Sequence, residues 1–450
     1  MTTIDRDRIH SLLSREQARF EEEHPISRKL FERAHSSLLA GVPMNWMTRW
    51  VGGFPVFVDE AQGSHFTDVD GHTYIDFCLG DTGAMAGHSP RPSVAGITER
   101  AGRGITLMLP SEDSIWVGEE MARRFGLPYW QFALTATDAN RFVLRLARDV
   151  TQRPKILVFN WCYHGTVDES FATLEGGRVV ARAGNVGPPV DVSATTRVCE
   201  FNDVEALEAE LAHEDVACVL AEPALTNIGI IHPEPGFHDH LRRLTRRYGT
   251  LLVIDETHTI CSGPGGFTKA EGLEPDVVTI GKPLAAGLPA AAYGLSEEVG
   301  QRILERADLL DPDAGGIGGT LAGNALSLAA MRATLENVLT EQAFEHMISL
   351  AERFVEGVSR VIESHGLEWH ITRLGCRAEY LFTKERPLNG SAAAAARDED
   401  LEELMHLYSL NRGILLTPFH MMALMSPQTT AADVDVHSEV FESAAEELTG

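Results

Sequence analysis

The sequence carries little basic charge and almost no lysine. Of its 450 residues, 38 are Lys or Arg and 65 are Asp or Glu, which gives a formal net charge of −27 at pH 7. A charge of this sign repels nucleic-acid phosphates and anionic lipid head groups. We therefore expect neither a nucleic-acid partner nor a membrane partner, and small-molecule chemistry becomes the leading class of function.

The sequence also lacks the long apolar runs of membrane proteins and secreted proteins. No stretch approaches about 20 uncharged apolar residues, and the charged first residues contain no apolar core of a secretory signal. The cysteines show no CxxC spacing, which in a long chain favours reduced, half-buried thiols. They are Cys78, Cys162, Cys199, Cys218, Cys261 and Cys376. Together these absences predict a cytoplasmic protein.

From about residue 115 to residue 300, helix-like and strand-like segments alternate. Short runs such as 218–222 (CVLAE) and 251–255 (LLVID) are apolar up to their last residue. Such runs are typical of parallel strands that are buried on both faces of a sheet. The alternation therefore predicts an α/β fold with a mostly parallel sheet.

The two ends of the chain do not continue this alternating pattern. Residues 5–40 predict an amphipathic helical segment, and residues 54–77 predict strands joined by tight turns. After about residue 325, long helices and few strands predict a smaller α+β lobe. We find no internal repeat and no long linker, so we expect one subunit with a large and a small lobe.

Lysine is rare enough to be considered residue by residue. The five lysines are Lys29, Lys155, Lys269, Lys282 and Lys384. Lys282 alone follows an apolar strand (DVVTIG) and precedes small residues. A lysine in such a desolvated setting loses its proton more easily and becomes a nucleophilic amine for carbonyl groups. A surface lysine with its stem along apolar neighbours is the alternative, and the local sequence leaves it open.

Two acids also stand at the ends of predicted strands. Asp255 ends the run LLVID, and Glu222 follows the run ACVLA. An acid at the carboxyl end of a buried parallel strand is unfavourable unless it meets a cation or a ligand. An acid that caps the next turn is the alternative for Asp255. The functional interpretation places both acids at the same sheet edge.

Two segments have features of a phosphate-binding loop. TATDAN (135–140) lies between a strand-like and a helix-like run, so it presents helix N-terminal N–H groups, although Thr and Asp are also ordinary N-caps. GGIGGTLAGN (315–324) follows no strand and has no GxGxxG register, so we reject a Rossmann site. A lysine, a strand-end acid and two such loops together indicate pyridoxal 5′-phosphate (PLP), with the lysine forming an imine and the acid facing the pyridinium nitrogen.

Several motifs occur in an order that one enzyme family shares: DVDGHTYIDF, GHSP, YHG, AEPALTNIG, LLVIDETHT, VVTIGKPLAAGLPAAAYG and GGTLAGNALSLAA. From about residue 40 onward the sequence resembles class III aminotransferases of PLP fold type I, above all glutamate-1-semialdehyde aminomutases and β-amino-acid aminotransferases. The resemblance implies a large PLP-binding domain (61–325) around a seven-stranded type of sheet. It also implies a small C-terminal domain (326–450) that is joined by an N-terminal segment (1–60), and a homodimer with shared active sites.

The resemblance also implies residue roles, position by position. Lys282 would hold PLP as an imine and move the proton, and Asp255 would keep the ring nitrogen protonated. Tyr163 would stack on the ring, unless it is a core aromatic, and Thr320 would reach the phosphate of the partner subunit. No metal ion is expected. The other matching positions are Thr135, Ala136 (in place of the usual Gly) and Thr137 in the phosphate loop, and His164, Glu222, Asn227, Thr257 and His258 around the ring.

Some positions depart from the aminomutase pattern. Trp46 stands where that pattern has a carboxylate-binding Arg, with Arg49 close by, and Met421 or Met422 replaces a pocket Glu. The Met-rich and aromatic surroundings favour a roomy apolar substrate pocket, although core packing explains them equally well. We therefore predict ping-pong transamination between an amine or amino acid with an apolar side chain and an oxo acid. The alternative is a PLP-dependent aminomutase, epimerase or decarboxylase; a non-enzymatic PLP-fold protein would lack the lysine or the acid.

Overall fold

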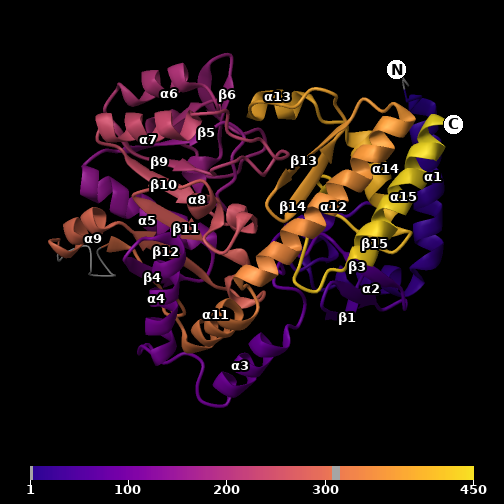
Figure 1. Cartoon of the computed structure of the whole chain (residues 1–450), viewed down its shortest axis with the longest axis horizontal. Coiled ribbons are helices and arrows are strands. Elements are labelled where there is room, and N and C mark those ends of the chain that lie inside the picture. The colour runs from indigo at the N-terminus through magenta and orange to yellow at the C-terminus, as the bar shows by residue number, and fades with distance from the viewer. Residues whose placement is uncertain (1–3, 307–314) are drawn as a thin grey trace. The chain divides into compact units, whose positions relative to one another are not determined.

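The computed structural model describes residues 4–306 and 315–450 (Figure 1). The chain forms two compact units, which we call unit 1 and unit 2. Unit 1 comprises residues 1–90, 345–386 and 396–450, and unit 2 comprises residues 91–344 and 387–395. The division into domains at residues 60 and 325 stays a prediction.

Unit 2 is built on a seven-stranded sheet with the strand order β4-β12-β11-β10-β9-β5-β8. Strand β12 runs antiparallel to both of its neighbours, and all the other pairs are parallel. The predicted α/β fold with a mostly parallel sheet is thus confirmed. The strands are β4 Tyr129–Ala133, β5 Lys155–Phe159, β8 Thr196–Cys199, β9 Val216–Ala221, β10 Leu251–Asp255, β11 Val277–Ile280 and β12 Ala291–Leu295.

Helices cover this sheet because their apolar faces complete its core. Helix α5 buries Phe142, Val143 and Leu146, which belong to one apolar cluster with the strands. Figure 1 shows α6 and α7 side by side next to β5 and β9. The helices of unit 2 are α3 Arg91–Ala101, α4 Glu112–Phe125, α5 Ala136–Thr151, α6 Val204–Leu211, α7 Phe237–Arg247, α8 Gly266–Ala270, α9 Glu297–Leu304, α11 Ala325–Asn337 and α13 Gly390–Ala395; a hairpin pairs β6 Ala172–Glu175 with β7 Arg178–Ala181.

Unit 1 contains two small sheets and five helices in its described part. The first sheet is β1-β2-β3-β15 and the second is β13-β14-β16. Residues 5–40 and 54–77 form helices and strands, as the sequence predicts. The strands are β1 Val58–Gln62, β2 His65–Asp68, β3 Thr73–Asp76, β13 His370–Leu374, β14 Arg377–Leu381, β15 Ile414–Leu415 and β16 Met422–Leu424. The helices are α1 Arg6–Glu23, α2 Pro25–Ala34, α12 Glu341–His365 (which starts within the range of unit 2), α14 Glu399–Leu410 and α15 Ala431–Thr449.

A buried polar cluster joins the first two helices to the β2–β3 hairpin. His24, between α1 and α2, has Nδ1 2.8 Å from the Phe20 carbonyl oxygen and Nε2 2.7 Å from the Tyr74 hydroxyl. That hydroxyl lies 2.8 Å from Asp68 Oδ2. The turn of the hairpin needs Gly71, whose φ is +92°. The cluster fixes how the N-terminal helices pack on this sheet.

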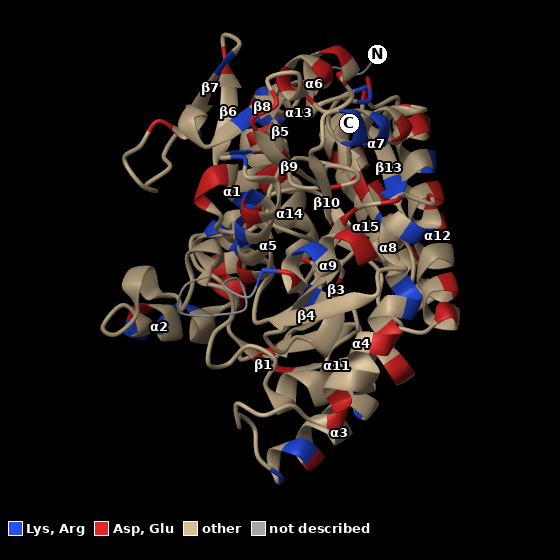
Figure 2. Cartoon of the chain, turned by 90° about the vertical axis from the view of Figure 1, so that its left-hand side faces the viewer, with Lys and Arg blue, Asp and Glu red and all other residues tan. Residues whose placement is uncertain are grey.

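Short 3-10 helices complete the described chain: η1 Leu39–Gly41, η2 Asn45–Arg49, η3 Asp168–Ser170, η4 Val192–Ala194, η5 Thr259–Ser262 and η6 Lys282–Ala285. Acidic residues occur on helices of both units, for example on α1, α6 and α12 (Figure 2). Among the described helices, none combines the length and the apolar content that crossing a membrane requires.

Candidate active site

Lys282 lies at the end of strand β11, where the chain turns into η6. Its φ is +52°, in the left-handed region that residues other than glycine seldom adopt. Such backbone strain persists where the surrounding structure enforces it, which happens often at functional sites. The Nζ atom lies 2.7 Å from His258 Nε2. Because an ammonium group can only donate, His258 accepts through Nε2 when Lys282 is charged.

The turn before Lys282 touches the start of helix α5. A Cβ atom on Gly281 would lie 3.1 Å from Ala136 Cβ and 3.2 Å from the Ala136 nitrogen. Glycine at this position therefore lets the end of β11 approach the helix N-terminus closely. The predicted lysine and the predicted phosphate loop are thus neighbours in space.

Asp255 is 3% exposed at the end of strand β10. Its Oδ2 accepts hydrogen bonds from Asn140 Nδ2 and His164 Nδ1, both at 2.9 Å, and its Oδ1 accepts one from the Thr257 backbone N–H at 3.1 Å. Burial opposes ionisation, yet the hydrogen bond and charge of His164, with the other donors, lower the pKa of Asp255. The carboxylate thus stays charged, and Oδ1 keeps room for a further donor.

His164 is the buried partner of that carboxylate. Burial opposes protonation of the ring, but interactions with Cys162 and with Asp255 raise the pKa of His164 to about 10. His164 and Asp255 therefore form a buried ion pair, in which the imidazolium supports the negative charge of the acid. The sequence places His164 near the cofactor, and the structure shows that it acts on Asp255.

The N-terminus of α5 forms the candidate phosphate cradle. Thr135 caps the helix by accepting a hydrogen bond from the Asp138 N–H at 3.2 Å. The N–H groups of Ala136 and Thr137 belong to the first turn, which has no acceptors within the helix. A Cβ atom on Gly165 (φ +77°) would meet Thr137 Oγ1 at 2.1 Å, so only glycine lets the YHG loop close on this turn.

Glu222 fixes the loop that carries Tyr163. Its Oε1 accepts a hydrogen bond from the Tyr163 N–H at 3.1 Å, and its Oε2 accepts one from the Thr226 N–H at 3.0 Å. Burial raises the pKa of Glu222. Asn227 donates to the Trp161 carbonyl oxygen at 3.2 Å. Glu222 and Asn227 thus bind the loop backbone around Tyr163.

The structure gathers most predicted cofactor residues at one edge of the unit 2 sheet, and Thr320 stands apart from them. Thr257 is buried there, and its hydroxyl has no hydrogen-bond partner among the described residues. Thr320, in contrast, is exposed in the segment before α11. The sequence reasoning missed Asn140 and Thr279. Their positions were the only signal: Asn140 lies one turn into α5, and Thr279 lies opposite Asp255 on β11.

The four predicted substrate residues lie in unit 1. The Trp46 ring lies 5.0 Å from the Phe419 ring, and the Arg49 guanidinium lies 5.8 Å from the Trp46 ring. Met421 and Met422 are buried on and beside strand β16. The aromatic contact shows that Trp46 meets the segment that contains both methionines. Their role toward a substrate stays a prediction.

The residues at the sheet edge fit PLP. Asp255 would offer an ionised carboxylate with remaining acceptor capacity to a protonated ring nitrogen, and Lys282 would offer an amine just after the end of the neighbouring strand β11. The glycine-lined first turn of α5 supplies N–H groups that have no acceptor within the helix, and Thr257 adds a buried hydroxyl with no hydrogen-bond partner in the described part of the chain. All these groups belong to unit 2.

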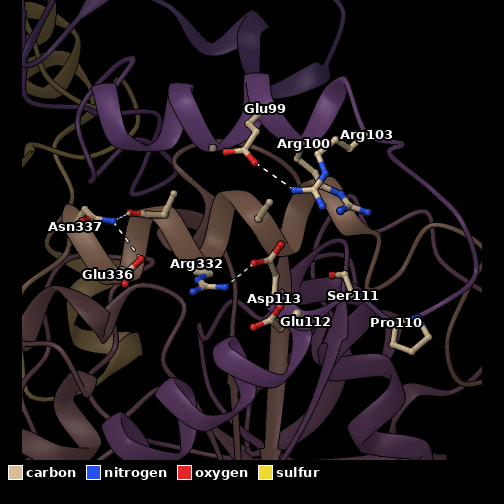
Figure 3. Close-up of a pocket in the computed structure, with 13 residues that line it drawn as sticks. Glu99, Arg100, Arg103, Pro110, Ser111, Glu112, Asp113, Arg332, Glu336 and Asn337 are labelled. Carbon is tan, nitrogen blue, oxygen red and sulfur yellow. Dashed lines mark hydrogen bonds and ion pairs between the residues drawn. The ribbon is translucent and has the colours of Figure 1, made fainter.

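A separate cavity of about 550 Å³ lies between α3, α4 and α11 of unit 2 (Figure 3). Two ion pairs lie in it, Arg332 with Asp113 at 3.1 Å and Arg103 with Glu99 at 3.2 Å. None of the predicted site residues lines it. We therefore do not assign the cofactor to this cavity.

Comparison with known proteins identifies the family. Residues 46–441 match the family described as aminotransferase class-III. The chain is 31% identical over 419 residues to glutamate-1-semialdehyde 2,1-aminomutase of Desulfitobacterium hafniense, covering 91% of this chain and 95% of that protein.

Solved structures agree with this match. A glutamate-1-semialdehyde aminomutase of Pseudomonas aeruginosa PAO1 superposes with a TM-score of 0.97 at 51% identity, covering 99% of both chains, and a lysine-to-alanine variant was solved in complex with PMP. A β-phenylalanine aminotransferase of Variovorax paradoxus superposes with a TM-score of 0.86 at 26% identity, covering 97% of both chains. The predicted family and cofactor class are confirmed: the chain belongs to the class III aminotransferases, a family of PLP-dependent enzymes.

Proposed function

We propose that this enzyme exchanges an amino group and an oxo group within one small substrate molecule, as an aminomutase. The observation that carries the proposal is the 51% identity, over 99% of both chains, to a protein described as a glutamate-1-semialdehyde aminomutase. The sequence analysis gives intermolecular transamination as its main interpretation and an aminomutase among its alternatives. The relatives favour the aminomutase.

The cofactor of this family supplies an electron sink that makes the bonds at the amine-bearing carbon labile. The protein contributes the proton chemistry around it. Asp255, kept ionised by His164, would hold a proton on the ring nitrogen. Lys282 Nζ, once neutral, would carry a proton between neighbouring atoms of the substrate. Its contact with His258 at 2.7 Å would hold the amine at the sheet edge.

A second candidate is transamination between an apolar amine or amino acid and an oxo acid. It is favoured by Trp46, which stands in place of a carboxylate-binding Arg and contacts Phe419. An aromatic surface of this kind suits an apolar substituent better than a second carboxylate. Trp46→Arg should then improve substrates with an additional carboxylate relative to apolar amines.

A homodimer with shared sites and a cytoplasmic location also belong to this proposal. The exposed positions of Thr320 and Leu321 before α11 support a contact with a second copy, because a free apolar side chain such as Leu321, 51% exposed, gains from being covered. The proposed partners are small molecules only: an amine or amino acid and, in the second candidate, an oxo acid.

The reactions differ in whether an added oxo acid is consumed. The holoenzyme is incubated with glutamate-1-semialdehyde and, separately, with a panel of apolar amines, each with and without pyruvate or 2-oxoglutarate. An aminomutase forms isomerised product without an added acceptor. Turnover that requires the oxo acid, with one amino group transferred per product, would replace the proposal by the second candidate. Lys282→Ala is the control and should lose both activities.

A further inference from the structure

Behind Asp255 lies a pair of polar residues that the mechanism above does not use. Asn140, on α5, and Thr279, on β11, are both fully buried. The Thr279 hydroxyl donates to Asn140 Oδ1 at 2.7 Å. Asn140 Nδ2 donates to Asp255 Oδ2 at 2.9 Å and to the His164 carbonyl oxygen at 3.1 Å.

These contacts determine the orientation of the Asn140 amide. Its nitrogen has two protons, and both have an acceptor; its oxygen has one donor, the Thr279 hydroxyl. Rotating the amide by 180° would place its oxygen against two acceptors, Asp255 Oδ2 and the His164 carbonyl. In a buried site such unpaired acceptors are strongly unfavourable. These two acceptors therefore ensure that Asn140 acts as a donor toward Asp255, and the Thr279 hydroxyl completes the arrangement by donating to the remaining amide oxygen.

The strand register places Thr279 directly beside Asp255. Strands β10 and β11 are parallel, and Asp255 pairs in register with Thr279. Helix α5 packs against β10 and β11, and its Asn140 forms hydrogen bonds with both Asp255 and Thr279. Because Asn140 and His164 both bind Oδ2, the carboxylate is fixed with Oδ1 left for another donor.

We propose that Asn140 and Thr279 are positioning residues that orient the Asp255 carboxylate toward the ring nitrogen of the cofactor. Thr279 anchors the Asn140 amide, Asn140 and His164 hold Oδ2, and Oδ1 would then be available to the ring nitrogen. The inference rests on the PLP dependence of the family. It is independent of whether the reaction is an amino shift within one molecule or between two.

Thr279→Val removes the hydroxyl and keeps the size of the side chain, whereas Thr279→Ser keeps the hydroxyl. For each variant, the dissociation constant of PLP is measured by titrating the apoenzyme. The pH at which the visible absorption of the bound cofactor changes is measured on the holoenzyme. Loss of a buried hydrogen bond in a charged network should raise the PLP dissociation constant of Thr279→Val about tenfold and shift its spectral pH profile. Thr279→Ser should restore both quantities.

Thr245→Val is the matched control, because Thr245 is equally buried and its hydroxyl donates to the Arg242 carbonyl oxygen at 2.9 Å, within helix α7. It should change neither quantity. Wild-type affinity and an unchanged spectral pH profile in Thr279→Val would overturn the proposal, as would equal behaviour of the Val and Ser variants.

Asn140→Asp is a second, isosteric test in case Thr279→Val does not fold. It replaces the donor toward Asp255 with an acceptor and should weaken PLP binding more than Thr279→Val does. PLP binding of wild-type strength in Asn140→Asp would also overturn the proposal. Neither readout uses a substrate, so failure here is distinct from failure of the proposed aminomutase reaction.

Discussion

Buried histidines in the two units have opposite surroundings. His164, in unit 2, donates to the Asp255 carboxylate at the sheet edge, and its pKa rises to about 10. His437, in unit 1, packs on the Phe354 ring at 4.2 Å, and neither of its ring nitrogens has a hydrogen-bond partner among the described residues. Burial alone lowers the pKa of His437 to about 3.

Burial is nearly complete for both residues, so the difference comes from their neighbours, which are Cys162 and Asp255 for His164 and aromatic rings for His437. An ionised acid makes the charged imidazole favourable, whereas an aromatic core makes it unfavourable. A buried histidine with a shifted pKa therefore does not by itself mark a functional site. The unit 2 edge differs because Oδ1 of its acid accepts from the Thr257 N–H and, with its second lone pair, can accept from a ligand. Substitutions at the unit 2 site and at His437 each test this comparison.

The largest effect should follow from removing the acid. Asp255→Asn leaves His164 as a buried histidine without a carboxylate, like His437, and removes the charge that faces the cofactor ring. We expect kcat/KM to fall roughly 10²–10³-fold, the scale for losing one preorganised electrostatic partner. Steady-state kinetics and the visible spectrum of the bound cofactor are the measurements.

Asp276→Asn is the control for this variant. Asp276 accepts two hydrogen bonds from Arg242 and one from the Leu252 N–H, all at 2.7 Å, so its loss weakens the fold at the opposite end of β10 from Asp255. It should leave the cofactor spectrum unchanged. Equal loss of kcat/KM in both variants would mean that Asp255 acts only through stability.

His164→Gln should have the next largest effect, on stability as a function of pH. The folded pKa of about 10 lies above the unfolded value of about 6.5, so folding retains a proton that the unfolded chain releases. The stabilisation from His164 is therefore complete below about pH 6.5 and disappears as pH rises toward 10. Breaking this buried pair should lower the free energy of unfolding by roughly 3–5 kcal/mol at pH 6.

Urea unfolding at pH 6, 8 and 9.5 measures that dependence. The difference between wild type and His164→Gln should shrink steadily as pH rises. His213→Gln, at an exposed histidine of the same unit, should leave the slope unchanged. A difference that stays constant with pH would contradict protonation of His164 in the folded enzyme.

The sequence predicted this edge only in part. Lys282 and Asp255 were predicted because each comes at the end of an apolar run, and the two runs form the paired strands β10 and β11. Asn140 could not be assigned a role, because its contact with Thr279 spans 139 positions and depends on how α5 crosses the sheet. The positions of Tyr163 and Glu222 were predicted, but the hydrogen bond that joins them follows from loop closure at Gly165.

Unit 1 was harder to predict for a related reason. It is assembled from three separate segments of the chain, and no local pattern shows which distant segments pack together. From the sequence, the Met-rich segment is compatible either with a roomy apolar substrate pocket or with core packing. Met421 and Met422 are buried at 1% and 0% exposure within unit 1, which core packing accounts for directly. Their hydrophobicity was evident from the sequence, but their surroundings were not.

The smallest effect is expected from His437→Leu, and its sign is opposite to that of His164→Gln. The folded pKa of about 3 lies below the unfolded value of about 6.5, so the unfolded chain binds a proton that the folded protein excludes. Wild type therefore loses stability as pH falls below about 6.5. Leucine removes this loss, so the variant should be more stable than wild type by about 2 kcal/mol at pH 5 and nearly equal at pH 7.

Urea unfolding at pH 7 and pH 5 tests this sign, with His10→Gln as the control at an exposed histidine of unit 1. Only His437→Leu should move the acid limb of the stability curve to lower pH. If instead it destabilises the protein equally at both pH values, the imidazole is held in the core by an interaction that leucine cannot replace. The contrast between the two histidines would then rest on packing rather than on proton affinity.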